Sequence, residues 1–224
     1  MPSTLPRIQP TKHAEPFVEE SKKTPEIFHY TPIGPYPTTE DLVNNLYYAW
    51  ALPNPGWLLM TVFDKTKPDQ HNIEGGRNGA LAGIVAYLNS EPQNLKTEIG
   101  AVFILPAFHK THVASNTIGL LLNYALNLPS APGGGLGLRR VVWYANALNV
   151  ASVRLAERMG FVSEGVARWE RALPMDKDGN GLARREGDPR ADWPGRDTAR
   201  LALCWDEWED GVKNKVAQII QRKS

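Results

Sequence analysis

The pattern of hydrophobic and polar residues predicts a series of strands through the middle and the end of the chain. Each is a short run rich in aliphatic, β-branched or aromatic residues, bounded by Gly, Pro or polar positions. The runs are residues 57–63, 81–89, 97–105, 139–145, 161–172 and 198–205. Residues 64–79 hold Pro68 and several glycines, which is typical of a turn, so we expect the first two strands to pair antiparallel.

Helical spacing of hydrophobic residues predicts helices between several of these strands. In residues 38–50, Leu42 and Leu46 recur at helical spacing after a threonine that can act as the N-cap. Residues 115–128 carry the clearest pattern, with Ser115 or Asn116 as candidate caps. That helix presents Ile118, Leu121, Leu122 and Ala125 on one face.

Two further helices follow from cap residues and periodicity. Asn149 can accept hydrogen bonds from the first free amides of a helix over 150–159, and Gly160 can end that helix at positive φ. A last helix begins at Asp206, with acidic residues at its start and basic residues at its end. This order of elements predicts an α/β (α+β) fold with a mixed, mostly antiparallel sheet.

The two least regular stretches lie at residues 1–26 and 174–196. The first holds five prolines and the second is long and polar. We expect 1–26 to be an N-terminal extension and 27–224 to form a single domain.

Charge and cysteine content exclude several classes of protein. Lys and Arg number 25 and Asp and Glu 24, so the chain lacks the basic excess that binding to nucleic acid or an anionic membrane requires. The single cysteine, Cys204, excludes an internal disulfide framework and fits a reducing compartment. The N-terminal residues have no apolar run, and we expect a soluble protein of the cytoplasm.

The most informative motif is N-x-x-S-x-R-x-x-E-R-x-G-F at residues 149–161, followed by Glu164-Gly165. It resembles the second half of the acyl-CoA site in the GNAT family of N-acetyltransferases, and most closely the RimJ/RimL-like branch. The upstream segment EIGAVFILPAFHKTHVASNTIGLLLNYAL (98–126) is similar to that family's strand, cofactor loop and helix, and Gly34-Pro35-Tyr36 fits the branch. The alternative is an ordinary strand–helix–strand unit with a coincidental match.

The resemblance implies a three-layer GNAT fold with about six or seven strands and a direct transfer of acetyl from acetyl-CoA to a primary amine. It implies no metal ion, and a monomer or a homodimer. The acceptor would be a protein N-terminus, a polyamine-like compound or a xenobiotic amine. Two rivals remain: a GNAT-fold protein that binds acyl-CoA without catalysis, and an O-acyltransferase with a larger pocket beside Phe103.

The resemblance also implies a cofactor site. The acetyl carbonyl would accept from a backbone amide near Val102–Phe103, and the loop 106–114 with the following helix would hold the pyrophosphate. This loop departs from the family pattern because it has no glycine, although His109, Lys110 and His112 could offset this by facing phosphates. An incidental surface loop is the alternative. The cofactor candidates are Phe103, Ile104, Leu105, His109, Lys110, Thr111, His112, Val113, Ala114, Ser115, Asn149, Ser152 and Arg158.

For Asn149, Ser152 and Arg158, a purely structural or solvated position is the alternative to cofactor binding. Asn149 and Ser152 match the family's pantetheine-binding and sulfur-proximal positions, but they could be only an N-cap and a solvated serine. Arg158, or Arg154, could reach the ribose 3′-phosphate or lie on a solvated helix face.

Acetylation of an amine requires a base, because an ammonium has no lone pair, and usually a proton for the leaving thiolate. Glu98 is the candidate general base, since partial burial on the acetyl-holding strand would raise its pKa. A structural carboxylate at a strand edge is the alternative, and Glu164 is the rival base. Ser152 is the candidate acid, with Tyr144 as its substitute.

Three other features of the sequence are weaker evidence of function. DKDGNG (176–181) mimics an EF-hand, but Gly187 stands where a bidentate Glu is required, so we expect no calcium site. Arginines around that loop could attract an acidic acceptor or be solvated. These arginines are Arg168, Arg171, Arg184, Arg185, Arg190, Arg196 and Arg200. Trp57 and Trp193 could line an acceptor pocket or belong to the core.

Overall fold

The computed structural model describes residues 3–73 and 79–221. A seven-stranded sheet has the order β1-β2-β3-β4-β5-β7-β6. Every neighbouring pair is antiparallel except β4 and β5, which are parallel. The predicted mixed, mostly antiparallel sheet is therefore confirmed. The strands are β1 (Ser3–Thr4), β2 (Leu58–Asp64), β3 (Ala80–Glu91), β4 (Lys96–Ile104), β5 (Arg140–Asn146), β6 (Val162–Ala172) and β7 (Gly195–Cys204).

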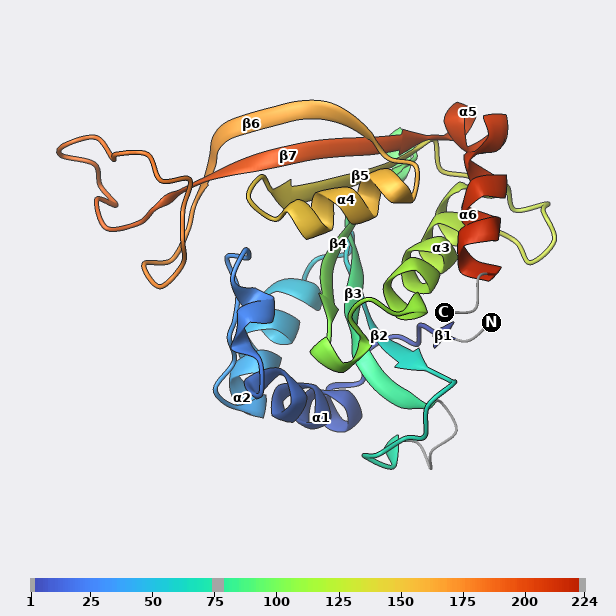
Figure 1. Cartoon of the computed structure of the whole chain (residues 1–224), viewed down its shortest axis with the longest axis horizontal. Helices are drawn as coiled ribbons and strands as arrows, with labels where there is room; N and C mark the ends of the chain where they lie inside the picture. Colours follow the sequence, from blue (N-terminus) through green and yellow to red (C-terminus); the bar gives the residue numbers. More distant parts are fainter. Residues whose placement is uncertain (1–2, 74–78, 222–224) are drawn as a thin grey trace.

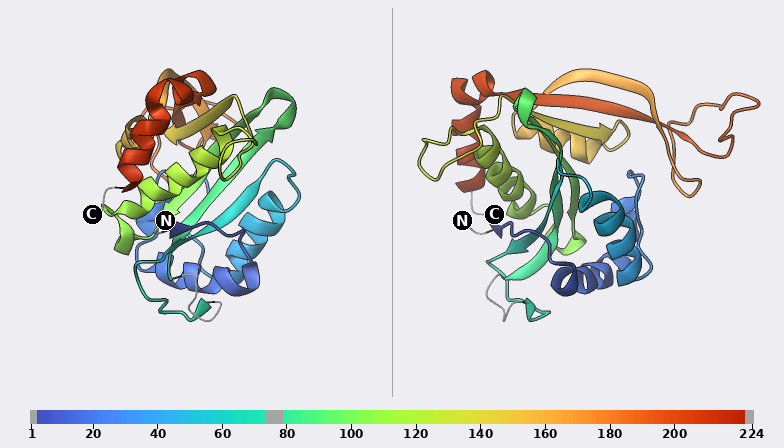
Figure 2. Two further views of the ribbon diagram at one scale, coloured as in Figure 1. Left: turned by 90° about the vertical axis from the view of Figure 1, so that its right-hand side faces the viewer. Right: turned by 180° about the vertical axis from the view of Figure 1, so that it is seen from behind.

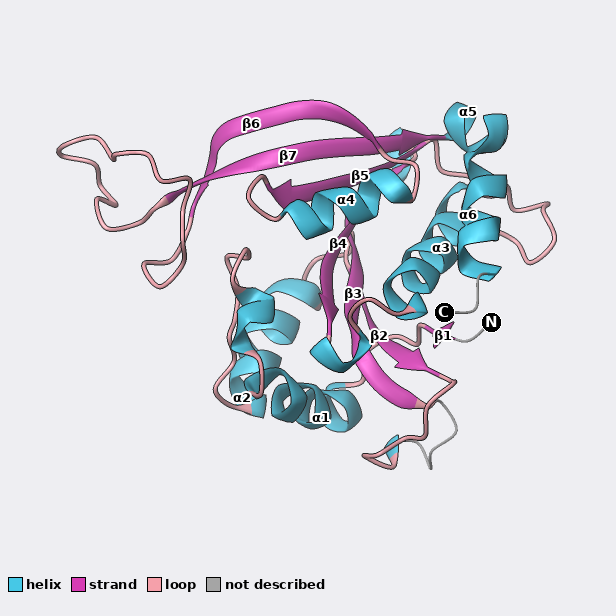
Figure 3. Cartoon of the chain, in the orientation of Figure 1, coloured by secondary structure: helices cyan, strands magenta, loops and turns pink. Residues whose placement is uncertain are grey.

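Helices flank the sheet, as the ribbon coloured by secondary structure shows (Figure 3). At the lower left of Figure 1 lie α1 and α2, and α4 lies beneath β5. The helical segments are α1 (Pro10–Lys22), η1 (Pro25–Phe28), α2 (Thr39–Leu42) continuing as the π-helix η2 (Val43–Ala51), η5 (Pro106–Phe108), α3 (His112–Leu126), α4 (Val150–Arg158), α5 (Trp205–Glu207), the π-helical η6 (Trp208–Val212) and α6 (Lys213–Gln221). No described helix combines the length and the apolar character needed to cross a bilayer.

The N-terminal residues contain a helix that the sequence analysis did not predict. Pro10 stands at the first helical turn of α1, where its missing N–H costs nothing. Ala14, Phe17 and Val18 of α1 are buried in the core at spacings of three and four residues. The prolines in this stretch argue against a helix and so masked the helical spacing, and one of them, Pro16, lies inside α1. The gain from burying Phe17 outweighs the poor helix propensity of proline.

Two other helix boundaries differ from the prediction. The N-cap of α3 is Thr111, which accepts from the Val113 amide at 3.3 Å, so Ser115 and Asn116 lie inside the helix. The C-terminal helix is interrupted, because Gly211 adopts φ of +122°. By contrast, Asn149 caps α4 as predicted, and Gly160 follows the helix at φ of +98°. The predicted turn at 64–79 lies partly outside the described residues.

The central strands separate in the middle of the sheet. Only Lys96–Glu98 of β4 pair with Arg140–Val142 of β5, although both strands continue beyond this point. Figure 1 shows β5, β7 and β6 across the top of the view while β4, β3 and β2 run downward from them. The view from behind in Figure 2 shows the same separation. The two halves of the sheet therefore leave room between β4 and β5.

Candidate active site

A cleft of about 240 Å³ lies where β4 and β5 separate. One wall consists of β4 residues from Glu98 to Phe103 and the other of β5 residues from Trp143 to Asn146 with the start of α4. The lining also includes Tyr30, Trp50, Trp57, Arg171 and Arg196. Of the residues predicted from sequence, the cleft brings together Glu98, Phe103, Tyr144, Asn149 and Ser152.

A β-bulge shapes the β4 wall. Ile84 of β3 faces Phe103 and Ala86 faces Gly100, so Ala101 and Val102 share the single position opposite Val85. Ala101 adopts φ of +48° in this bulge. Gly83 permits the close approach of β3, because a Cβ there would lie 2.1 Å from the Phe103 carbonyl oxygen. The bulge takes Ala101 and Val102 out of regular pairing, which frees backbone groups to face the cleft.

Glu98 is only 8% exposed, although it belongs to the lining of the cleft. Its Oε2 accepts a hydrogen bond from Asn89 Nδ2 at 2.8 Å. Burial raises the pKa of Glu98, while Asn89 and the positive charges of Arg171, Arg196 and Lys96 oppose that rise. A raised pKa makes this carboxyl group a better proton acceptor than an ordinary glutamate, while its role as the general base stays a prediction.

The start of α4 presents Ser152 to the cleft. Asn149 Oδ1 accepts from the Ser152 amide at 3.1 Å, and Ser152 Oγ accepts from Trp143 Nε1 at 3.0 Å. Because the indole occupies an acceptor position of the hydroxyl, the hydroxyl proton remains available for donation. This geometry suits Ser152 as a proton donor.

Tyr144 belongs to the lining of the same cleft. The residue is 37% exposed, and its ring lies 5.8 Å from the Arg200 guanidinium. Its role as the substitute for Ser152 stays a prediction.

The loop between β4 and α3 has one residue in the left-handed backbone conformation, although the loop contains no glycine. Lys110 has φ of +59° and its side chain is exposed. Each histidine has a contact within the protein: His109 Nε2 lies 2.8 Å from the Ile104 carbonyl oxygen, and His112 Nε2 lies 3.3 Å from Asp64 Oδ1. His109 is nevertheless exposed, as is Lys110 beside the α3 N-terminus, and contact of these residues with phosphates stays a prediction.

The remaining cofactor candidates lie outside the cleft lining. Ser115 Oγ accepts from Arg158 Nη2 at 3.0 Å, which ties α4 to α3. Arg158 is otherwise exposed and keeps further N–H donors, so its role as a phosphate ligand stays a prediction beside that of a solvated arginine. Ile104, Leu105 and Val113 are buried, and Ala114 packs against the same core.

Other residues singled out from the sequence have structural contacts. Glu164 forms an ion pair with Arg140 at the surface, and this contact lowers the pKa of Glu164. Trp57 lines the cleft, whereas Trp193 stacks on Arg190 at 4.3 Å. Cys204, Asp206 and Glu207 form the one described group with metal-ligand spacing, but Glu207 instead accepts from the Cys204 amide and caps α5.

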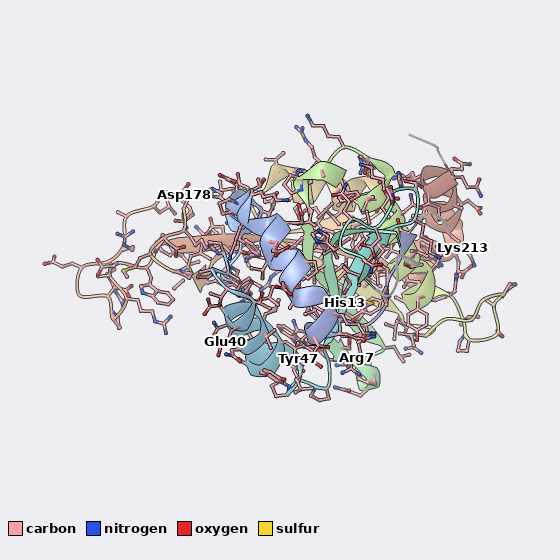
Figure 4. All side chains as sticks on the ribbon, turned by 90° about the horizontal axis from the view of Figure 1, so that it is seen from below. Arg7, His13, Glu40, Tyr47, Asp178 and Lys213 are labelled. Atoms are coloured by element: carbon pink, nitrogen blue, oxygen red, sulfur yellow. The ribbon has the colours of Figure 1, made fainter. Side chains whose placement is uncertain are left out.

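The DKDGNG segment attaches the loop between β6 and β7 to the region after α1. Lys177 is buried, and its Nζ donates to the carbonyl oxygens of Phe28 at 3.2 Å and Gly34 at 2.6 Å. His29 Nε2 lies 3.3 Å from Asp178 Oδ2, and Figure 4 shows Asp178 beside η1. Lys177 occupies the second position of the EF-hand-like segment, so this geometry agrees with the expectation of a connecting loop.

Sequence reasoning missed several residues of the cleft. Asn89, Trp50 and Tyr30 had no motif to mark them, and Arg171 and Arg196 were indistinguishable from five other arginines near the loop. The burial of Arg196 is what separates it, and burial of an arginine depends on tertiary packing.

The sheet separates at its parallel strand pair, and the β4 bulge and the start of α4 both line the cleft that results. The model of the Acetyltransferase (GNAT) domain matches residues 4–162, and the chain therefore belongs to the GNAT family of N-acetyltransferases, enzymes that use acetyl-CoA. No curated protein matches the chain.

Solved structures share the fold at low sequence identity. A probable GNAT acetyltransferase from Chromobacterium violaceum has a TM-score of 0.71 at 22% identity, covering 93% of this chain and 86% of its own. A GCN5-related N-acetyltransferase from Brucella melitensis has a TM-score of 0.71 at 23% identity, covering 97% and 82%. Spermidine N-acetyltransferase from Vibrio cholerae, solved with CoA and spermine, has a TM-score of 0.63 at 18% identity, covering 93% and 98%.

Proposed function

We propose that this protein transfers the acetyl group of acetyl-CoA directly to a primary amine, with Glu98 as the general base and Ser152 as the general acid. The observation that carries the proposal is a buried carboxyl group of raised pKa that lines the cleft beside the β4 bulge. The amine belongs to a protein N-terminus or a small molecule. The protein acts in the cytoplasm, and its motif supports membership of the RimJ/RimL-like branch.

The residues present fit acetyl-CoA. The bulge at Ala101–Val102 offers backbone amides for the acetyl carbonyl, and the N-terminus of α3 offers free amides for the pyrophosphate. Lys110 adds a positive charge beside that helix terminus. Asn149 and Ser152 lie across the cleft from the bulge, in position for the pantetheine arm.

Acetyl-CoA supplies a thioester carbonyl that an uncharged amine can attack. Glu98 removes the proton of the attacking nitrogen, directly or through a water molecule, so that the new C–N bond can form. Amides near Val102–Phe103 donate to the carbonyl oxygen as negative charge develops on it. Ser152 gives its proton to the sulfur as the C–S bond breaks, and the products are the acetylated amine and CoA.

The N-terminal residues contribute to this unit. We propose that residues 27–224 form a single domain and that residues 1–26 are an extension held onto it by the pairing of β1 with β2 and by the burial of α1.

A polyamine is a specific alternative for the amine acceptor, because the similar Vibrio cholerae structure is a spermidine N-acetyltransferase with bound spermine.

A GNAT-fold protein that binds acyl-CoA without catalysis is the second candidate function. The observation that favours it is the glycine-free loop, in which Lys110 occupies a left-handed conformation that is unfavourable for a lysine.

Two measurements on the full chain separate the candidates. Titration calorimetry with acetyl-CoA tests binding, and detection of free thiol in a panel of primary amines tests transfer. We expect both to be positive, with acetylated product confirmed by mass spectrometry. Binding without amine-dependent thiol release would contradict the enzymatic proposal and support the non-catalytic one.

A further inference from the structure

Two arginines meet at the outer end of the cleft. Arg171 near the end of β6 and Arg196 near the start of β7 are directly opposite each other in the strand register. Both belong to the lining of the same cavity as Glu98. Like charges placed opposite each other on neighbouring strands repel, so the pair is unfavourable unless something compensates it.

Arg196 is the more constrained of the two. Its side chain is 7% exposed, and its Nε has no hydrogen-bond partner among the residues that the structure describes. A buried guanidinium N–H without an acceptor carries a desolvation penalty. Burial and the neighbouring charge of Arg171 lower the pKa of Arg196 to about 10, so the group remains charged at neutral pH.

The nearby carboxylates offset this pair only in part. Glu98 and Glu170 attract Arg196 and oppose the fall of its pKa, but burial and Arg171 prevail, and Glu98 accepts its hydrogen bond from Asn89. Glu170 is paired with Arg200 at 2.7 Å. The outer cleft therefore holds two guanidinium groups against one carboxyl group that must itself exchange a proton.

Another cation of the loop between β6 and β7 has a structural role. Lys177 donates to the carbonyl oxygens of Phe28 and Gly34, and so holds the loop against the wall that carries Tyr30. Trp50 and Trp57 complete that wall with apolar surface. A cavity of about 240 Å³ with this lining suits a small molecule or the end of a chain.

We propose that the acceptor is an amine that also carries an anionic group, a carboxylate or a phosphate, and that Arg171 and Arg196 bind this group while the amine faces Glu98. This inference rests on the proposed function and names the class of its acceptor. Guanidinium groups bind carboxylate and phosphate through paired N–H donors, which also orients the ligand. An acceptor with extra ammonium groups would be repelled.

Matched pairs of amines test the proposal with the full chain and acetyl-CoA. The pairs are β-alanine with β-alaninamide, and phosphoethanolamine with ethanolamine, with spermidine as a polycation. We expect kcat/KM to be at least about tenfold higher for the anionic member of one pair, which is the effect of one charged hydrogen bond. Comparing the β-alanine pair with the phosphoethanolamine pair shows whether the site binds a carboxylate or a phosphate. The amide is less basic than the acid, so amine reactivity alone favours the neutral partner.

The variant Arg171→Gln tests the residues. Because Arg171 is exposed, the substitution should not prevent folding. We expect the anionic-to-neutral ratio of kcat/KM to fall about tenfold, while Arg168→Gln, an exposed arginine of β6 outside the cleft lining, keeps the wild-type ratio. Arg196→Lys, which retains charge but not the paired donors, should give an intermediate ratio.

The outcomes separate this proposal from the proposed function. Acetylation of neutral amines or spermidine with no anionic preference overturns the acceptor class and leaves the transferase activity standing. An anionic preference that survives Arg171→Gln unchanged overturns the assignment of the arginines. Failure to acetylate any amine overturns both proposals.

Discussion

Glu98 is held between two opposing influences. Its burial raises the pKa, whereas the hydrogen bond from Asn89 and the charges of Arg171, Arg196 and Lys96 act to lower it. Burial prevails. A carboxyl group in this state is protonated more readily in the folded chain than in the unfolded chain, which affects both activity and stability.

We expect Glu98→Gln to lower kcat/KM by about 10²-fold or more, the usual contribution of a general base. In the wild type, kcat/KM should rise with pH through the raised pKa of Glu98, and the variant should lose this limb of the profile. Glu164→Gln, which breaks only the surface pair with Arg140, is the control. Normal turnover by Glu98→Gln at neutral pH would show that another group is the base.

The same substitution should stabilise the protein at neutral pH. Because the folded-state pKa of Glu98 is raised, the folded protein binds more protons than the unfolded chain between the ordinary pKa of glutamate and that of Glu98. The free energy of unfolding therefore falls as pH rises through this window. Glu98→Gln removes that loss, and urea unfolding at acidic and neutral pH measures it. Equal stability of the two proteins at all pH values would contradict the raised pKa.

Lys110 combines an unfavourable backbone conformation with a useful charge. Its φ of +59° costs about 1–2 kcal/mol for a residue with a Cβ, and glycine would remove this cost. We expect Lys110→Gly to raise the free energy of unfolding by roughly 1 kcal/mol, while Lys110→Ala leaves it unchanged. Both should weaken acetyl-CoA binding by a similar factor in calorimetry, because both lose the ammonium. Unchanged affinity in the two variants would exclude Lys110 from the phosphate site.

At the scale of elements, a buried lysine helps to attach the loop between β6 and β7 to the segment after α1, beside the contact of His29 with Asp178. Burial lowers the pKa of Lys177, and its ammonium donates to the carbonyl oxygens of Phe28 and Gly34. The two segments meet at the outer end of the cleft, where Tyr30 and Arg171 belong to the same lining. The position of the loop therefore affects the proposed acceptor side.

Lys177→Met should release this loop without altering the acetyl-CoA side. Loss of the ammonium removes the donor to the Gly34 carbonyl oxygen, at a cost of about 1–3 kcal/mol, whereas the Phe28 carbonyl oxygen still accepts from Thr31. We expect faster proteolytic cleavage within residues 174–194 and a several-fold higher KM for the amine, with an unchanged dissociation constant for acetyl-CoA. Lys65→Met, at an exposed lysine after β2, is the matched control. Equal cleavage rates for the two variants would contradict the role of Lys177.

Element prediction from sequence succeeded where local chemistry decides the structure. Asn149 was predicted as the cap of α4 and Gly160 as its end, and both are confirmed, because cap hydrogen bonds and positive φ are local requirements. The start of α3 was misplaced because Thr111, Ser115 and Asn116 are all good cap residues. Only the position of the chain after β4 selects among them.

At the scale of the whole molecule, aromatic contacts connect the N-terminus with the cleft. The ring of Phe17 in α1 meets Phe28 edge-on at 6.4 Å, and Phe28 lies 4.9 Å from the ring of Phe103 in β4. Phe103 belongs to both the core and the cleft lining. The N-terminal helix therefore supports the strand that carries the proposed acetyl site.

We expect Phe17→Ala to destabilise the protein by about 3–5 kcal/mol, because it leaves a cavity between α1 and η1. Glu15→Ala, at an exposed position of the same helix, should change stability by less than about 0.5 kcal/mol. Urea unfolding compares the two variants. A small effect of Phe17→Ala would mean that α1 is only loosely associated with the domain.

The sequence by itself determined most strands, the caps of two helices and, through the 149–161 motif, the family, because propensity, periodicity and cap chemistry act over short distances. Only the tertiary structure decided where β4 and β5 separate, that Glu98 and Arg196 are buried, and that α1 joins the core. Burial and charge compensation depend on residues far apart in the chain. For this reason Arg196 was one arginine among seven near its loop in the sequence and is distinct in the folded protein.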